Sequence, residues 1–200
     1  MKQLAVTLVC GLALACGGGK AAGDGSVGGP VGQSDAHGTV EGQPFEAKDS
    51  LTYVGFDGTG NSFLTIWVSS FDHACGRAGQ NQGVKDAAVL VLDLSTTDEQ
   101  GKKRSAATRP GDYQLGAVVK NPANSAQVAA LRTDSTCRAT PVAVGQATGH
   151  VTLSSVNISG ASGTFDFTFG SANDHVTGAF QAVACPAALQ AAKSPSTMCK

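Results

Sequence analysis

Apolar and polar residues alternate with a period of two along several short stretches of this chain. In the clearest stretch, residues 163–169, every second residue is Phe, and Thr164, Asp166 and Thr168 stand between them. Successive side chains of a strand point to opposite faces of a sheet, so this pattern is typical of a half-buried β-strand. Residues 175–184 continue the alternation after a short polar segment. The two stretches together predict a β-hairpin.

Two other stretches carry apolar residues on both faces. Residues 62–70 place Leu64, Ile66 and Val68 on one face, and the opposite face also holds aromatic residues, among them Trp67. The same holds for residues 87–94, whose leucines align on one face. We expect strands that are covered on both sides.

Further strands are expected at 38–41, 44–54, 112–119, 126–132 and 146–155. Residues 126–131 would serve equally well in a helix. About nine or ten short strands separated by Gly, Asn, Asp and Pro predict an all-β fold, either an antiparallel β-sandwich or a closed β-barrel. The one expected helix is short and C-terminal, Pro186–Lys193, with Pro at its first position and Ser194-Pro195 after it.

The N-terminus has the pattern of a bacterial lipoprotein signal. Lys2 gives a positive start, residues 4–14 are apolar, and the small residues Ala13 and Ala15 precede Cys16. The apolar segment is about half the roughly 20 residues that a membrane-spanning helix needs. We therefore predict a signal peptide at residues 1–15 and lipidation of Cys16. The alternative is an ordinary secretory signal that leaves Cys16 unmodified.

Residues 16–36 are rich in Gly and small residues and are expected to form a disordered tether after the lipidated cysteine. Several acyl chains such as palmitate on Cys16 would make membrane anchoring stable, because one chain alone binds weakly. Gly17, which stands where an inner-membrane lipoprotein would carry aspartate, favours the outer membrane. Residues 37–200, about 160 residues, fit a single β domain.

Four cysteines fall in that domain: Cys75, Cys137, Cys185 and Cys199. In an oxidising compartment an even number predicts two disulfides, with three possible connectivities. The preferred pairing is Cys185 with Cys199, which closes a short loop, and Cys75 with Cys137. A zinc site is the weaker alternative, because no Cys-x-x-Cys spacing is present.

The charge pattern excludes one class of partner. The net charge is -1 and 14% of the residues are charged, with Lys102-Lys103-Arg104 as the one basic cluster. Nucleic-acid binding requires a basic face, so no nucleic-acid partner is expected. A membrane partner through the lipid anchor is expected, and a protein or small-molecule partner stays open.

Several segments resemble uncharacterised β-sheet lipoproteins of myxobacterial type. The resemblance covers most of residues 37–200 and rests on turn glycines and strand residues at 38–45, 111–113, 149–153, 163–166 and 174–180. It implies a lipid-anchored β-sandwich or barrel, and it implies no activity.

No catalytic motif is found, and no catalytic, cofactor-binding or metal-binding residue is assigned. Of the four histidines, His37, His73, His150 and His175, two follow an aspartate, as Asp72-His73 and Asp174-His175. If the two pairs met in the fold they would form a metal or acid–base site, but we expect both pairs to be exposed residues at the ends of loops. Asp166 is expected to be solvated.

Trp67 and Tyr113 could stack on a ligand, although packing in the core is the expected role of such rings. The sequence therefore predicts a non-enzymatic envelope lipoprotein with a binding or structural role. The alternative is a small-ligand carrier that uses the interior of a barrel, and a metal-dependent or hydrolytic enzyme is a third possibility.

Overall fold

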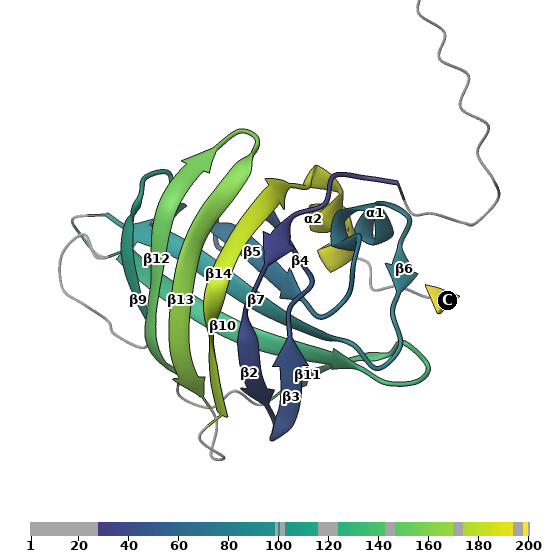
Figure 1. Cartoon of the computed structure of the whole chain (residues 1–200). Helices are drawn as coiled ribbons and strands as arrows, with labels where there is room; N and C mark the ends of the chain where they lie inside the picture. The colour runs from purple at the N-terminus through teal and green to yellow at the C-terminus, as the bar shows by residue number, and fades with distance from the viewer. Residues whose placement is uncertain are drawn as a thin grey trace, which may run out of the picture.

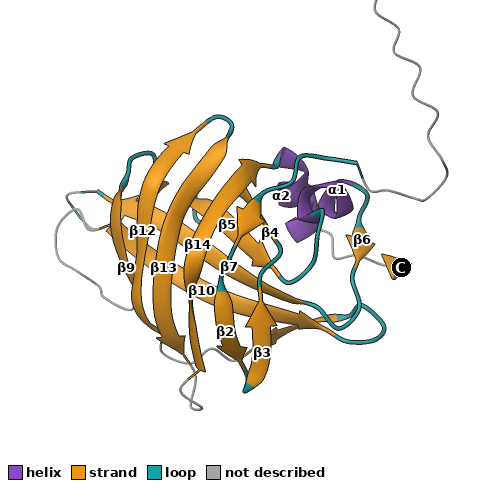
Figure 2. Ribbon diagram, in the orientation of Figure 1, coloured by secondary structure: helices purple, strands orange, loops and turns teal. Residues whose placement is uncertain are grey.

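The computed structural model describes residues 28–98, 100, 103–115, 124–142, 147–169, 174–193 and 198–199. Within them, eight strands form a closed barrel (Figures 1 and 2). These strands are β4 (Asp49–Phe56), β5 (Ser62–Ser69), β7 (Ala88–Thr97), β9 (Gly111–Leu115), β10 (Asn124–Thr133), β12 (Thr148–Asn157), β13 (Gly160–Phe169) and β14 (Asp174–Ala184). The predicted signal peptide and Cys16 lie outside the described residues.

The barrel closes because each of the eight strands pairs with two others. The order around it is β4, β5, β7, β10, β9, β12, β13 and β14, and β14 pairs with β4 again. All neighbours run antiparallel except β9 with β10 and β14 with β4, which are parallel. Of the two folds that the sequence allowed, the structure has the closed barrel with extra strands outside it.

Seven shorter strands lie outside this ring: β1 (Gln33–Ser34), β2 (His37–Val40), β3 (Gln43–Glu46), β6 (Gln82–Gly83), β8 (Arg104–Ala106), β11 (Ala139–Val142) and β15 (Met198–Cys199). The β2–β3 hairpin pairs with β14 beside β1. Its buried residues Val40 and Phe45 join the core of the barrel. Arg132 of β10 donates from Nη2 to the backbone oxygen of Val40 at 2.9 Å, which holds the hairpin against the wall.

Large apolar side chains fill the interior of the barrel. Phe165, Phe167 and Phe180 are at most 2% exposed, and the rings of Phe165 and Phe167 stack with centroids 4.8 Å apart. Leu90, Leu92 and Leu94 of β7 face them within the same buried cluster. The period-two pattern of residues 163–169 correctly placed Phe165 and Phe167 on a buried face.

The folded domain begins upstream of residue 37, the boundary that the sequence suggested. Within the segment assigned to the tether, Gln33 and Ser34 pair with β14, and Ala36 is fully buried. Gly32 lies so close to β4 that a Cβ atom there would be 1.9 Å from the backbone oxygen of Ser50. Glycine at this position therefore permits a close contact between two backbone segments, which a side chain would prevent.

The expected strands are present with one change: the stretch 44–54 divides into β3 and β4. The stretch 126–132 is strand β10, as expected, and not the helix that its residues would also allow, because it pairs with strands on both sides. Residues 116–119 of the stretch 112–119 lie outside the described residues. Helix α2 has the predicted bounds, Pro186–Lys193.

The sequence missed helix α1 (Ala74–Gly79), which has six residues and contains two glycines. Local preference does not favour a helix there, so tertiary contacts must stabilise it. Helices α1 and α2 lie against each other on the outside of the barrel beside β4 (Figure 1). No helix in the described part of the chain is long and apolar enough to cross a membrane.

The four cysteines form two disulfides as expected, but the preferred pairing was wrong. The structure joins Cys75 to Cys185 and Cys137 to Cys199. The first bridge ties the start of α1 to the residue before α2, and the second ties the loop before β11 to β15. Pairing was judged by distance along the chain, whereas closure of the barrel brings together cysteines 110 residues apart. Because all four sulfur atoms are in disulfides, the alternative of zinc ligation by these thiols is excluded.

Candidate functional site

The outer surface of the barrel has two different halves. On the half made of β9, β12, β13 and β14, the outward residues are polar, for example Gln114, His150, Asp166 and Thr177, which lie in one cross-strand row. Polar side chains of this kind fit a face in contact with water.

The other half, made of β4, β5, β7 and β10, is largely apolar on its outside. Trp67, Val91, Ala129 and Leu131 point outward, because residues next to them along each strand face the core. Tyr53 lies on the same side, where its ring meets that of Trp67. Helices α1 and α2 cover part of this face (Figure 2). The strands predicted to be covered on both sides, 62–70 and 87–94, lie in this half.

A cavity of about 820 Å³ lies between this apolar wall and the helices. We call it the outer groove. Its floor is formed by Tyr53, Trp67, Val91, Ala129 and Leu131, and its rim by residues of α1, β6, α2 and the loop before β11. Small-molecule sites are typically concave, mostly apolar and 300–1,000 Å³ in volume, so the outer groove has the size and character of such a site.

Two aromatic rings form one end of the groove floor. The rings of Tyr53 and Trp67 meet edge to face, with centroids 5.8 Å apart at an angle of 83°. Burial raises the pKa of Tyr53 to about 12, and the nearby carboxylate of Asp93 acts in the same direction. The Tyr53 hydroxyl is therefore a neutral group near pH 7.

Asp93 lies on the outer face of β7 behind these rings. Its Oδ1 accepts a hydrogen bond from Thr65 Oγ1 at 2.6 Å, and burial raises its pKa. Nε1 of Trp67 is buried, and a hydrogen-bonding interaction of the indole with the Tyr53 hydroxyl opposes the rise in the pKa of Tyr53.

The charged groups that line the groove are both cationic. Arg77 comes from α1, and Arg138 comes from the loop before β11. Nε of Arg77 donates to the backbone oxygen of Asp72 at 3.1 Å, which fixes that side chain beside the helix. Within the described ranges, no carboxylate lines the groove and neither arginine forms an ion pair.

Helix α1, one wall of the groove, is held in place by a buried carboxylate. Asp49 is fully buried at the start of β4. Its Oδ2 accepts from the first amide of α1, Ala74 N, and its Oδ1 accepts from the amides of Gly32 and Ser50, each at 2.7 Å. Burial raises the pKa of Asp49, and these three amides oppose that effect. This residue could not be recognised from the sequence, because a single Asp in a polar stretch has the pattern of a solvated side chain.

Known proteins do not identify the site. Comparisons with protein-family models, with curated proteins and with solved structures found no match to this chain.

The two Asp-His pairs do not converge. Asp72 and His73 lie near Cys75, which is bridged to Cys185 at the end of β14. His175 lies at the other end of β14, ten residues before Cys185 and about 33 Å from it along the strand. Asp174 instead accepts hydrogen bonds from the amides of Glu41 and Gly42 in the β2–β3 turn, at 2.7 and 2.9 Å.

His175 has a different partner from the one the sequence suggested. Its Nε2 lies 3.0 Å from Asp166 Oδ1, and both side chains are about half exposed. His150 is the cross-strand neighbour of Asp166 on the other side. No three His, Cys, Asp or Glu side chains in the described part of the chain are placed to hold a metal ion. The expectation that Asp166 is solvated is confirmed.

The two aromatic residues singled out in the sequence have separate roles. Tyr113 is 1% exposed inside the barrel, and its hydroxyl donates to the backbone oxygen of Arg109 at 2.9 Å. Trp67 lines the outer groove. The signal for the groove was present in the sequence, since residues 62–70 and 87–94 are apolar on both faces, but sequence could not show what covered the outer face.

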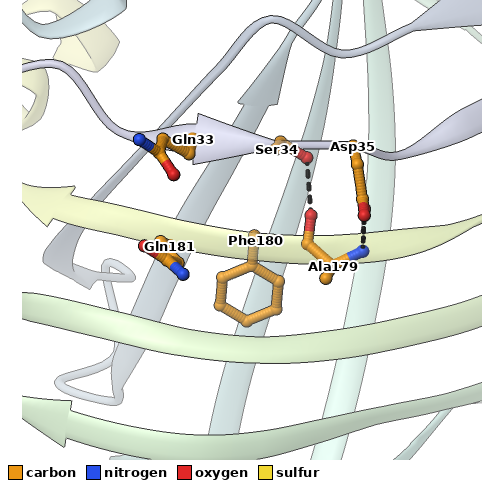
Figure 3. A pocket seen from close by; sticks show the side chains of 6 residues that line it. All are labelled: Gln33, Ser34, Asp35, Ala179, Phe180 and Gln181. Atoms are coloured by element: carbon orange, nitrogen blue, oxygen red, sulfur yellow. Dashed lines mark hydrogen bonds between the residues drawn. The ribbon is translucent and has the colours of Figure 1, made fainter.

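A second, smaller hollow of about 240 Å³ lies along β1 and β14 (Figure 3). Ser34 Oγ donates to the backbone oxygen of Ala179 at 2.8 Å, and Asp35 Oδ1 accepts from its amide at 2.6 Å. Phe180, drawn beside them, belongs to the buried core. The polar groups here hold β1 to the barrel, so this hollow is a structural seam.

Proposed function

We propose that this chain is a non-enzymatic lipoprotein of the bacterial cell envelope whose barrel binds a small, largely apolar ligand in the outer groove. The observation that carries the proposal is the 820 Å³ groove with its aromatic and aliphatic floor. The sequence had suggested a carrier that uses the barrel interior. Side chains fill the described interior, so the proposed ligand site lies outside the ring.

Three observations support the envelope location. Cys16 follows an apolar segment of signal-peptide length, the segment after it is rich in Gly, and all four domain cysteines are in disulfides. Disulfides persist in oxidising compartments outside the cytosol. We propose an acylated Cys16, as in the lipoproteins of myxobacterial type that the sequence resembles, and attachment to the outer membrane, which Gly17 after the cysteine favours.

The binding proposal is tested with decanol, a neutral apolar probe. Trp67 is the one tryptophan of the sequence and lines the groove, so its fluorescence reports occupancy without a label. We expect decanol to shift the emission of the full chain in a saturable way. Ala129→Phe should abolish the response, because Ala129 is exposed on the groove floor.

The matched control is Gln127→Phe. Gln127 lies two residues earlier on the same strand, is also exposed on the outside, and does not line the groove. It should bind decanol as the unchanged chain does. A saturable response that survives in Ala129→Phe, or no response in the unchanged chain, would contradict a ligand site in the groove.

The anchor is tested separately, with radioactive palmitate and the variant Cys16→Ala. We expect the label and membrane association to be lost together. Retention of both in Cys16→Ala would refute lipidation at this residue.

A further inference from the structure

The charged groups that line the outer groove are donors of hydrogen bonds and not acceptors. Arg77 and Arg138 bring two guanidinium groups to the lining, and a guanidinium donates hydrogen bonds and accepts none. A ligand group that lies beside these two side chains is therefore favoured if it supplies acceptors.

The charged side chains among the described lining residues are both positive. Within the described part of the chain, no Asp or Glu is among the lining residues, and neither arginine is neutralised by an ion pair. Two carboxylates near groove residues accept hydrogen bonds from other groups. Asp93 accepts from Thr65, and Asp134 accepts from Thr136 and from the amide of Arg138. The charge of Arg138 is one of the smaller causes that lower the pKa of Asp134.

We propose that the ligand of the outer groove is an amphipathic anion: an aliphatic or aromatic body of moderate size with a terminal carboxylate or phosphate. The inference rests on the proposed function and adds the class of ligand. The apolar body packs on Tyr53, Trp67, Val91 and Leu131, and the anionic group lies toward Arg77 and Arg138. Arginine suits this role because its planar donors match the oxygens of carboxylate and phosphate.

The test compares decanoate with decanol on the full chain, with Trp67 fluorescence as the readout. The two probes have the same alkyl chain, and near pH 7 they differ by one negative charge. We expect decanoate to bind about tenfold more tightly, as one charge-assisted contact of about 1.4 kcal/mol would give. This preference should shrink as NaCl is raised from 0.05 to 0.5 M, because salt screens partly exposed charges.

The double variant Arg77→Gln/Arg138→Gln should abolish the preference, so that decanoate binds no more tightly than decanol to that variant. Arg104→Gln is the matched control, because Arg104 lies on β8 and does not line the groove. It should keep the full preference. Decyl phosphate, used in parallel, separates the two kinds of headgroup, and tight binding of either anion supports the proposal.

The outcomes separate this inference from the proposal on which it depends. Equal affinity for decanoate and decanol in the unchanged chain would overturn the anion inference while leaving a groove that binds apolar ligands. A preference that persists in the double variant would overturn the role of the two arginines. Failure of all three probes to bind would overturn the proposed function itself.

Discussion

Replacement of Asp49 should destabilise the protein more than any exposed charge does. Its carboxylate is fully buried and accepts three backbone amides at 2.7 Å, from Gly32, Ser50 and Ala74. These amides belong to the segment before β1, to β4 and to the first turn of α1. Asp49→Ala leaves all three without this acceptor.

The magnitude follows from the number of amides left unsatisfied. A buried donor that loses its partner costs about 1–3 kcal/mol, and relaxation makes three such losses less than additive. We expect Asp49→Ala to lower the free energy of unfolding by about 4 kcal/mol. For a domain of this size this lowers the melting temperature by about 8–16 °C. Asp49→Asn keeps one acceptor oxygen and should cost about 2 kcal/mol.

Urea unfolding followed by circular dichroism, with the disulfides intact, measures these differences. The exposed Asp166→Asn is the control and should change stability by less than about 0.5 kcal/mol. A change of less than 1 kcal/mol in Asp49→Ala would refute the assignment of Asp49 as the link between α1 and the barrel.

Acidification gives a second readout of the same residue. The pKa of Asp49 is raised in the folded state, so the folded protein holds this proton more tightly than the unfolded chain does. Between the raised folded pKa and the ordinary 3.8, the contribution of Asp49 to stability therefore grows as pH falls. The stability gap between the unchanged chain and Asp49→Asn should widen over that range. A gap that narrows would show that the three amides outweigh burial.

Three further predictions concern other parts of the fold. Replacing Cys75 and Cys185 together by Ala should lower the free energy of unfolding by about 4 kcal/mol, because the bridge joins residues 110 positions apart. A peptide that links Cys75 to another cysteine in a non-reducing digest would contradict this pairing. Hydrogen bonds from Asn61 and Thr59 lower the pKa of Asp57 to about 2. The contribution of Asp57 to stability is therefore present above pH 3.8 and lost as pH falls from 3.8 toward 2. Carbon NMR of the Asp57 carboxyl should show a titration midpoint of about 2, and an ordinary value near 3.8 would refute the prediction. Burial raises the pKa of both tyrosines, that of Tyr53 to about 12, so the stabilisation by the neutral phenols is lost only as pH rises above 10. Absorbance at 295 nm should show little ionisation of tyrosine at pH 10.5 in the folded protein. A normal titration near pH 10 would be inconsistent with the buried rings.

The class of fold and most of the barrel strands could be predicted from local patterns in the amino-acid sequence. Alternation fixes which residues of a strand face inward, because side chains alternate with a period of two whatever the strand pairs with. Phe165 and Phe167 were placed in the core on this basis, and the bounds of α2 followed from Pro186 and Ser194-Pro195. These are local properties, and they needed no knowledge of neighbours.

Pairing and coverage were decided only by the tertiary structure. Parallel contact of β14 with β4 closes the ring, and this closure brings Cys75 to Cys185, a pairing that distance along the chain argued against. Helix α1 exists because Asp49 and a disulfide hold six residues that would not form a helix alone. The outer groove likewise joins residues 53 to 192, whose proximity depends on how the strands are ordered. Sequence patterns record which faces are apolar, but the contacts between distant segments are set by closure of the whole barrel.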